Sequence, residues 1–165
     1  MSADHISRRR PSLLQLLTLL CFLSVISPSK SDDLPALLRL KSALEKSNTR
    51  VFDTWTPENS ICNFTGVVCE TNQVVKEINL SQQHLSGTLR FDSICALQAL
   101  EKISFGSNFL YGSINTEDLT NCTRLRYLDL GQNSFTGTVP DLSSLSQLKF
   151  LSLNKSGFSG PFPWK

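Results

Sequence analysis

Residues 125–140 read LRYLDLGQNSFTGTVP, and looser copies of this stretch lie on both sides of it in the chain. Each copy has apolar residues at its first, fourth and sixth positions, a polar residue at its ninth position and a glycine near its end. The copies begin at Val75, Leu100, Leu125 and Leu148, so that successive starts are 25, 25 and 23 residues apart. A fixed period of this length is typical of a repeat protein, whose units stack to bury a continuous core.

The pattern within each copy indicates a leucine-rich repeat. Its alternating apolar residues predict a short strand, and stacking would place the strands side by side, about 4.8 Å apart, as a parallel sheet. Asn108 and Asn133 are expected to turn inward and bond backbone groups where the chain bends. Gln83 and Ser156 hold this place in the outer repeats, where the polar ladder should be weaker. We therefore predict a leucine-rich repeat solenoid over residues 75–165, with about four repeats, the last incomplete. It would be a right-handed α/β-type superhelix with the parallel sheet on its concave face.

Residues 32–74 precede the repeats and are predicted to form a helical N-terminal cap. Asp33 can cap a helix over residues 32–46, and Pro35 suits its first turn. A cap is needed because the first coil of a solenoid would otherwise expose its apolar end to water. The side chains expected to cover that end are Leu37, Leu38, Leu40, Phe52 and Trp55.

Residues 1–31 are typical of a secretory signal peptide. Three arginines at residues 8–10 precede an apolar run over residues 13–26, and cleavage is expected near Ser31. The alternative is a membrane anchor, but the run is short for a membrane span and is interrupted by Gln15 and Thr18. The predicted location is the secretory pathway, and then the extracellular space or the outer side of the plasma membrane.

The net charge of +2 arises largely in this leader. From residue 32 onward there are 12 basic and 13 acidic residues, a balance of 12 − 13 = −1, which gives no sign of a nucleic-acid partner. Catalytic candidates are also weak. His84 lies in a repeat turn without a nearby nucleophile motif, and Glu117 and Asp118 are adjacent in sequence and would point in different directions. No catalytic residue is therefore assigned.

Four cysteines follow the leader, and an even number in an oxidising compartment favours two disulfides. Four cysteines allow three pairings. Cys62 and Cys69 are close in sequence and are paired on that ground, which leaves Cys95 with Cys122, in consecutive repeats. A zinc site is the alternative, but its usual cysteine spacing is missing and His84 is the only histidine after the leader. No metal and no cofactor are expected.

Secretion also makes the four Asn-x-Ser/Thr sequons candidates for N-glycosylation. They are Asn63, Asn79, Asn121 and Asn154. Asn121 and Asn154 are the favoured acceptors. Asn63 lies inside the predicted small disulfide loop, and a glycan on Asn79 would obstruct the concave face.

The strand residues that point outward should form columns across the repeats. One column holds Glu77, Lys102, Tyr127 and Phe150. With Asp129 of the next column, Lys102, Tyr127 and Phe150 form a mixed aromatic and charged patch suited to contact with a peptide or protein ligand. The alternative, which the sequence alone favours, is ordinary solvated strand surface.

Several segments resemble one family of plant proteins. The ending Thr136–Pro140 matches the plant-specific class of leucine-rich repeat, and residues 55–69 resemble the plant N-terminal cap, with Phe64 in place of its customary tryptophan. Three further segments look similar to the HAIKU-type plant receptor-like kinases, a group that includes relatives that perceive secreted peptides. These segments are Phe91–Cys95, Asn121–Thr123 and residues 162–165.

The resemblance implies an extracellular recognition segment of a receptor-like kinase for peptide-hormone signalling, with a secreted peptide or protein ligand and a co-receptor as partners. Members of that family also carry a membrane helix and a cytoplasmic kinase. This sequence has no glycine-rich phosphate loop and no HRD or DFG element, so we expect no enzyme activity, and membrane contact only through a further C-terminal part. The alternative is a free-standing secreted repeat protein, such as an inhibitor of pathogen cell-wall enzymes or a decoy. A transcript read past Lys165 distinguishes the two.

We also expect residues after 148 to fray, because no cap follows the fourth repeat.

Overall fold

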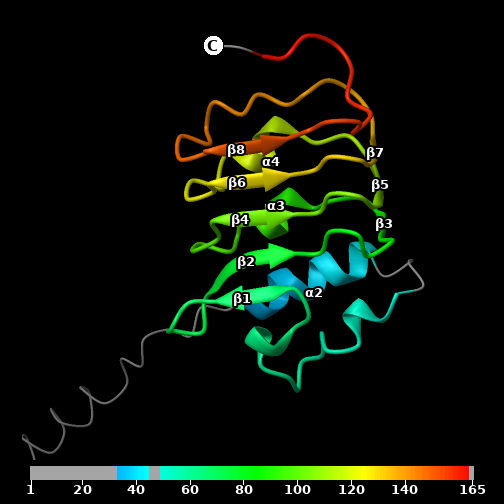
Figure 1. Ribbon diagram of the computed structural model, residues 1–165. Helices are drawn as coiled ribbons and strands as arrows, with labels where there is room; N and C mark the ends of the chain where they lie inside the picture. Colours follow the sequence, from blue (N-terminus) through cyan, green and yellow to red (C-terminus); the bar gives the residue numbers. More distant parts are fainter. Residues whose placement is uncertain (1–32, 45–48, 164–165) are drawn as a thin grey trace, which may run out of the picture. The chain divides into compact units, whose positions relative to one another are not determined.

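The computed structural model describes residues 33–163 except 45–48, so the predicted signal peptide and its cleavage point lie outside the described residues. Short helices and strands alternate along the chain (Figure 1). The helical elements are α2 Asp33–Leu44, η1 Arg50–Phe52, η2 Ile61–Asn63, α3 Phe91–Ile94 and α4 Thr116–Leu119. The strands are β1 Val67–Cys69, β2 Val75–Asn79, β3 Ser86–Gly87, β4 Lys102–Ser104, β5 Phe109–Gly112, β6 Tyr127–Asp129, β7 Ser134–Phe135 and β8 Phe150–Ser152.

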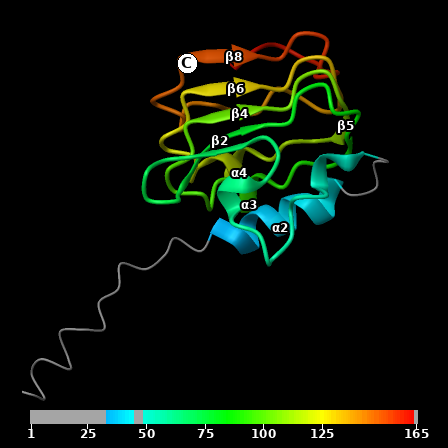
Figure 2. The same cartoon turned by 60° about the horizontal axis from the view of Figure 1, so that its bottom comes forward.

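A five-stranded sheet in the order β1-β2-β4-β6-β8 forms one side of the stack. From β2 onward the pairing is parallel, and each coil adds one strand in register, so that Glu77 pairs with Lys102, Lys102 with Tyr127 and Tyr127 with Phe150. Helices α2, α3 and α4 lie on one side of this sheet (Figure 2). The predicted leucine-rich repeat solenoid is confirmed. We call the sheet face turned away from the helices the concave face.

Two strand features were not predicted from the sequence. Strand β1 pairs antiparallel with β2 and adds a cap strand to the sheet. Gly66 permits this close approach, because its φ is +82° and a Cβ there would lie 2.3 Å from the carbonyl oxygen of Asn79. The second feature is a smaller sheet in the order β3-β5-β7, formed just after each main strand.

The cap covers the first coil with α2 and three aromatic rings. Leu37 and Leu40 are buried as predicted, whereas Leu38 is only partly buried. Trp55 is fully buried and contacts Phe52 edge-on and Phe64 face-on, at ring-centroid distances of 5.1 and 5.2 Å. Each large apolar side chain buried in this way contributes about 1.5–3 kcal/mol.

Asp33 also has a structural role that differs from simple helix capping. It is the first residue of α2, is 4% exposed, and its Oδ2 accepts a hydrogen bond of 2.9 Å from the backbone N–H of Val75. A carboxylate at a helix start is favoured by the helix dipole, and here it also ties the helix to the first residue of β2. The described helix runs to Leu44, and its predicted end at residue 46 lies outside the described residues.

The inward asparagines join neighbouring coils as expected. Oδ1 of Asn108 accepts hydrogen bonds from the backbone N–H groups of Gln83 and Leu85, and its Nδ2 donates to the carbonyl groups of Leu80 and Phe105. Asn133 makes equivalent contacts one coil later.

In the described part of the outer repeats, the side chains at this position bond within their own turns instead of between coils. The amide of Gln83 donates to the carbonyl of Ser81, and the hydroxyl of Ser156 donates to the carbonyl of Leu153, both within their own turns. The polar ladder is therefore concentrated in the middle coils.

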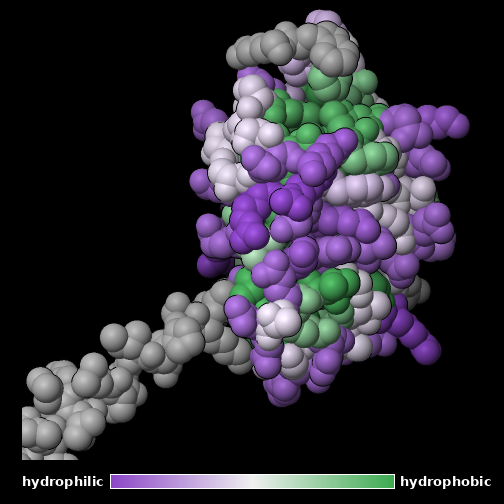
Figure 3. Space-filling model, turned by 60° about the vertical axis from the view of Figure 1, so that its left-hand side comes forward, coloured by the Kyte–Doolittle hydropathy of each residue, from purple (hydrophilic) through white to green (hydrophobic). Residues whose placement is uncertain are grey.

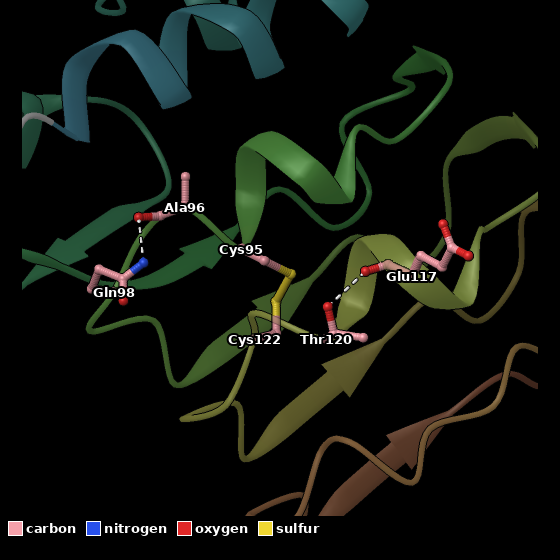
Figure 4. Close-up of a disulfide and its surroundings, with 6 residues drawn as sticks. All are labelled: Cys95, Ala96, Gln98, Glu117, Thr120 and Cys122. Atoms are coloured by element: carbon pink, nitrogen blue, oxygen red, sulfur yellow. Dashed lines mark hydrogen bonds between the residues drawn. A yellow bond between two sulfur atoms is a disulfide. The ribbon is translucent and has the colours of Figure 1, made fainter.

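Two disulfides join segments of the described chain. Cys62 and Cys69 enclose the turn before β1, with Cα atoms 5.6 Å apart. Cys95 and Cys122 connect the ends of α3 and α4 in consecutive coils, with Cα atoms 4.6 Å apart (Figure 4). Beside this bond, the Thr120 hydroxyl donates to the carbonyl of Glu117 and closes the short helix α4.

The fourth coil buries its apolar residues less completely than the third. Leu125, Leu128 and Leu130 are at most 1% exposed, whereas the corresponding Leu148, Leu151 and Leu153 are only partly buried. The reason is that β8 pairs with β6 on one side only within the described sheet.

Candidate functional site

The candidate site on the concave face is a ladder of side chains that spans four coils. Nζ of Lys102 lies 3.5 Å from Oε2 of Glu77 on one side and 5.2 Å from the ring centroid of Tyr127 on the other. The rings of Tyr127 and Phe150 then stack at 4.2 Å, with an interplanar angle of 6°. Phe150 is 44% exposed. The structure therefore brings three of the four predicted ligand-binding residues into one column.

Asp129, the fourth predicted residue, lies in the next column and is partly buried. Its Oδ1 accepts a hydrogen bond of 3.0 Å from the N–H of Gly131, and its carboxylate occupies space beside Gly106 that a Cβ would fill. Gly131 similarly leaves room for the side chain of Asn154, whose Oδ1 accepts from the hydroxyl of Ser152. These two polar side chains are held close to the backbone.

The arrangement suits non-covalent recognition. The stacked rings offer an apolar platform whose geometry is fixed by adjacent coils, and lysine and aspartate flank it with opposite charges. A preorganised surface loses little side-chain entropy when a ligand binds. Within residues 33–163 except 45–48, no group of three or more metal-ligating side chains gathers in one place.

The four sequons lie in different settings. Asn63, Asn79, Asn121 and Asn154 are all exposed. Asn79 and Asn154 stand on the concave side, where Asn79 accepts from the N–H of Ser81 and Asn154 accepts from Ser152. Asn121 follows α4, on the side of the helices.

A charged cluster that the sequence reasoning missed lies where the main strands begin. Glu101, with a side chain 14% exposed, is within 3.9 Å of Lys76, 3.5 Å of Arg124 and 3.4 Å of Arg126. One feature of the sequence could have revealed this cluster: Lys76, Glu101 and Arg126 occupy the same position in successive repeats.

On the helical side, Arg90 donates two hydrogen bonds of 3.2 and 3.1 Å to the carboxylate of Asp92. These bonds hold the pKa of Asp92 below its ordinary value and raise that of Arg90. Both side chains are about half exposed, so the pair is a surface feature.

The fold and this surface define the chain as a capped leucine-rich repeat protein. Comparison with known protein families agrees: residues 30–70 match the leucine rich repeat N-terminal domain, and residues 124–145 match the leucine rich repeat.

The relatives narrow this class to a family. The chain is 53% identical over 120 residues to Receptor-like protein kinase 7 of Arabidopsis thaliana and 46% identical over 133 residues to Receptor-like protein kinase HAIKU2 of the same plant. These alignments cover 72% and 73% of this chain but only 12% and 13% of the relatives, so the chain spans about an eighth of their length. By sequence it is similar to the N-terminal part of these plant receptor-like kinases, and this confirms the resemblance that its HAIKU-like segments indicated.

Solved structures agree with this assignment. The Arabidopsis receptor kinase HAESA, in complex with the peptide hormone IDA and the co-receptor SERK1, matches 73% of this chain and 21% of its own, with a TM-score of 0.68 and 28% identity. The described residues of the present chain form a cap and repeats, and no kinase domain lies among them. None of the helices in this part is long and apolar enough to cross a membrane.

Proposed function

We propose that this chain is the extracellular recognition segment of a plant leucine-rich repeat receptor-like kinase, used in peptide-hormone signalling and without enzyme activity of its own. The proposal is supported by the similarity to two receptor-like kinases and to a receptor whose structure holds a peptide hormone and a co-receptor. A secreted peptide or protein is the ligand, and a co-receptor is the second partner. Two disulfides are consistent with an extracellular location.

The observation that carries the proposal is the stacked pair of Tyr127 and Phe150 on the concave face. Aromatic side chains dominate the energy of many protein interfaces. In this pair the Phe150 side chain is 44% exposed and Tyr127 is partly buried. Lys102 and Asp129 would orient polar groups of the ligand beside the rings.

A random peptide library displayed on phage tests the proposal directly. The full chain is immobilised, and enriched peptides are measured against two double variants. Tyr127→Ala with Phe150→Ala removes the concave pair. Phe109→Ala with Tyr111→Ala is the matched control, because these aromatics are 58% and 45% exposed on β5, outside the concave face.

We expect the concave variant to lose peptide binding and the control variant to keep it. Removing two anchoring rings should weaken binding by roughly 30-fold or more, since hot-spot residues each contribute about 1–2 kcal/mol or more. If the control variant loses binding and the concave variant retains it, this assignment of the face is wrong.

Among the four sequons, we favour Asn121 for modification. Its side chain is exposed on the helical side, whereas Asn79 and Asn154 hold polar contacts on the concave face. We include glycosylation of Asn121 in the proposal, since a glycan there leaves the concave face open. Mass spectrometry of the secreted chain before and after enzymatic deglycosylation measures the occupancy of each site.

A further inference from the structure

A basic surface lies on the flank of the solenoid where the main strands begin, apart from the concave ladder. Lys76, Glu101, Arg126 and Lys149 occupy one column, in which the N–H of each later residue donates to the carbonyl of the one before at 2.8 Å. The column therefore runs along the stack. Figure 3 shows this flank, with a band of strongly hydrophilic residues across its middle coils.

The charges along this column are unequal. Lys76 is shared between Glu70 and Glu101, at 3.6 and 3.9 Å. Further along, Arg124 and Arg126 pair with Glu101, and Lys149 follows Arg126 in the column. The four basic and two acidic side chains give 4 − 2 = +2 in total, and the excess lies on the third and fourth coils.

Glu101 also orients the two arginines. Its carboxylate contacts one nitrogen of Arg124 and one of Arg126, while these side chains remain 54% and 51% exposed. Each guanidinium has five N–H donors, so most of its donors remain available to a further oxyanion. A planar guanidinium recognises carboxylates in a bidentate manner.

A hollow of about 310 Å³ lies between the third and fourth coils at this point. It is lined by Thr123, Arg124, Arg126 and Gln147, all of them polar. Its walls therefore offer hydroxyl and amide groups next to the two guanidinium groups. This combination fits a ligand that carries both carboxylates and hydroxyls.

We propose that this flank, defined by Arg124, Arg126, Lys149 and the adjoining hollow, binds an acidic polysaccharide built of uronic acid rings. Each ring carries one carboxylate for an arginine or lysine and several hydroxyls for Thr123 and Gln147. An acidic peptide fits less well. The hollow has no aromatic or aliphatic lining for an anchor residue, and the column N–H groups are already bonded.

The test measures binding of the full secreted chain to an immobilised, unesterified oligogalacturonate. Binding is expected to weaken as salt is raised, since the Debye length falls from about 10 Å at 0.1 M to about 3 Å at 1 M. The double variant Arg124→Gln with Arg126→Gln should bind roughly tenfold less tightly, because each exposed ion pair has a modest effect. Glu101→Gln should bind more tightly, because it removes the competing carboxylate. Thermal unfolding verifies that each variant is folded.

Matched controls separate this site from general charge effects. Arg39→Gln with Arg50→Gln makes the same change of charge in the cap, at two exposed positions, and should leave binding unchanged. The methyl-esterified polymer keeps the hydroxyls without the carboxylates, and polyglutamate keeps the carboxylates without the sugar rings. Both should bind weakly.

Three results would overturn the proposal. The first is that the cap variant loses as much oligogalacturonate binding as the Arg124 and Arg126 variant. The second is that the methyl-esterified polymer binds as tightly as the unesterified one. The third is that polyglutamate binds as tightly as the oligogalacturonate, which would favour an acidic peptide as the ligand. None of them affects the peptide role of the concave face, because the Tyr127 and Phe150 variants test that role separately.

Discussion

Two aromatic pairs on the surface of the described residues differ in what holds them in place. Tyr127 and Phe150 come from adjacent coils and stack at 4.2 Å, with Lys102 against the tyrosine ring. Phe109 and Tyr111 come from the single strand β5, and the phenylalanine contacts His84 only loosely, at 6.1 Å with a 40° tilt. The difference shows how a solenoid builds a binding surface: the register of the stack holds side chains from distant parts of the sequence together before any ligand arrives.

The largest expected loss of stability comes from removing the disulfide that joins the coils of Lys102 and Tyr127. Cys95 and Cys122 join the segments that lead into β4 and β6. Replacing both by serine should lower the free energy of unfolding by about 3–4 kcal/mol, because the bond closes a long loop in the unfolded chain. Urea unfolding measures this loss.

The cap disulfide is the matched control for this change. Cys62 and Cys69 are only 7 residues apart in sequence, against 27 for the other pair. Their replacement should lower the free energy of unfolding by about 2–3 kcal/mol. A larger loss from the cap bond than from the coil bond would contradict this ranking.

A second change compares the two coils that carry the stacked rings. Leu128 lies beneath Tyr127 and is 1% exposed, whereas the corresponding Leu151 beside Phe150 is only partly buried. Leu128→Ala should cost about 3 kcal/mol of unfolding free energy and Leu151→Ala about 1 kcal/mol, since the cost follows the buried contacts removed. Chemical denaturation of both variants measures the difference, and equal values would mean that the fourth coil is as well packed as the third.

The smallest effect concerns Lys102, which links Glu77 to the aromatic pair. Lys102→Met removes the ion pair and the cation–π contact but keeps most of the aliphatic stem. Since both contacts are partly exposed, the loss should be below about 1 kcal/mol. Thermal unfolding measures the stability, and a loss of several kcal/mol would show that the ladder is structural rather than a recognition surface.

Much of the architecture could be predicted from the sequence because repeat patterns are local. The spacing of Leu125, Leu128 and Leu130 indicated the strand, and the repeat period placed Lys102, Tyr127 and Phe150 in one column. The roles of Asn108 and Asn133 also followed from the pattern, since each repeat bends at the same place.

What the sequence did not predict depends on contacts outside the pattern. Strand β1 is only three residues long, and it forms because Gly66 lets the backbone approach Asn79. The cluster around Glu101 depends on where long side chains reach, and Arg124 joins it from a different position in its repeat. Asp33 was expected to cap a helix, yet its carboxylate also reaches Val75, 42 residues away in the sequence.

The central claim is that the concave face, through Tyr127 and Phe150, is the recognition surface. The most direct measurement is the NMR shift of aromatic ring protons as a library-selected peptide is titrated into the full chain. We predict saturable shifts for the Tyr127 and Phe150 rings, while the rings of Phe109 and Tyr111 stay unchanged. Shifts confined to Phe109 and Tyr111 would contradict the claim and would place recognition on the β5 side of the molecule.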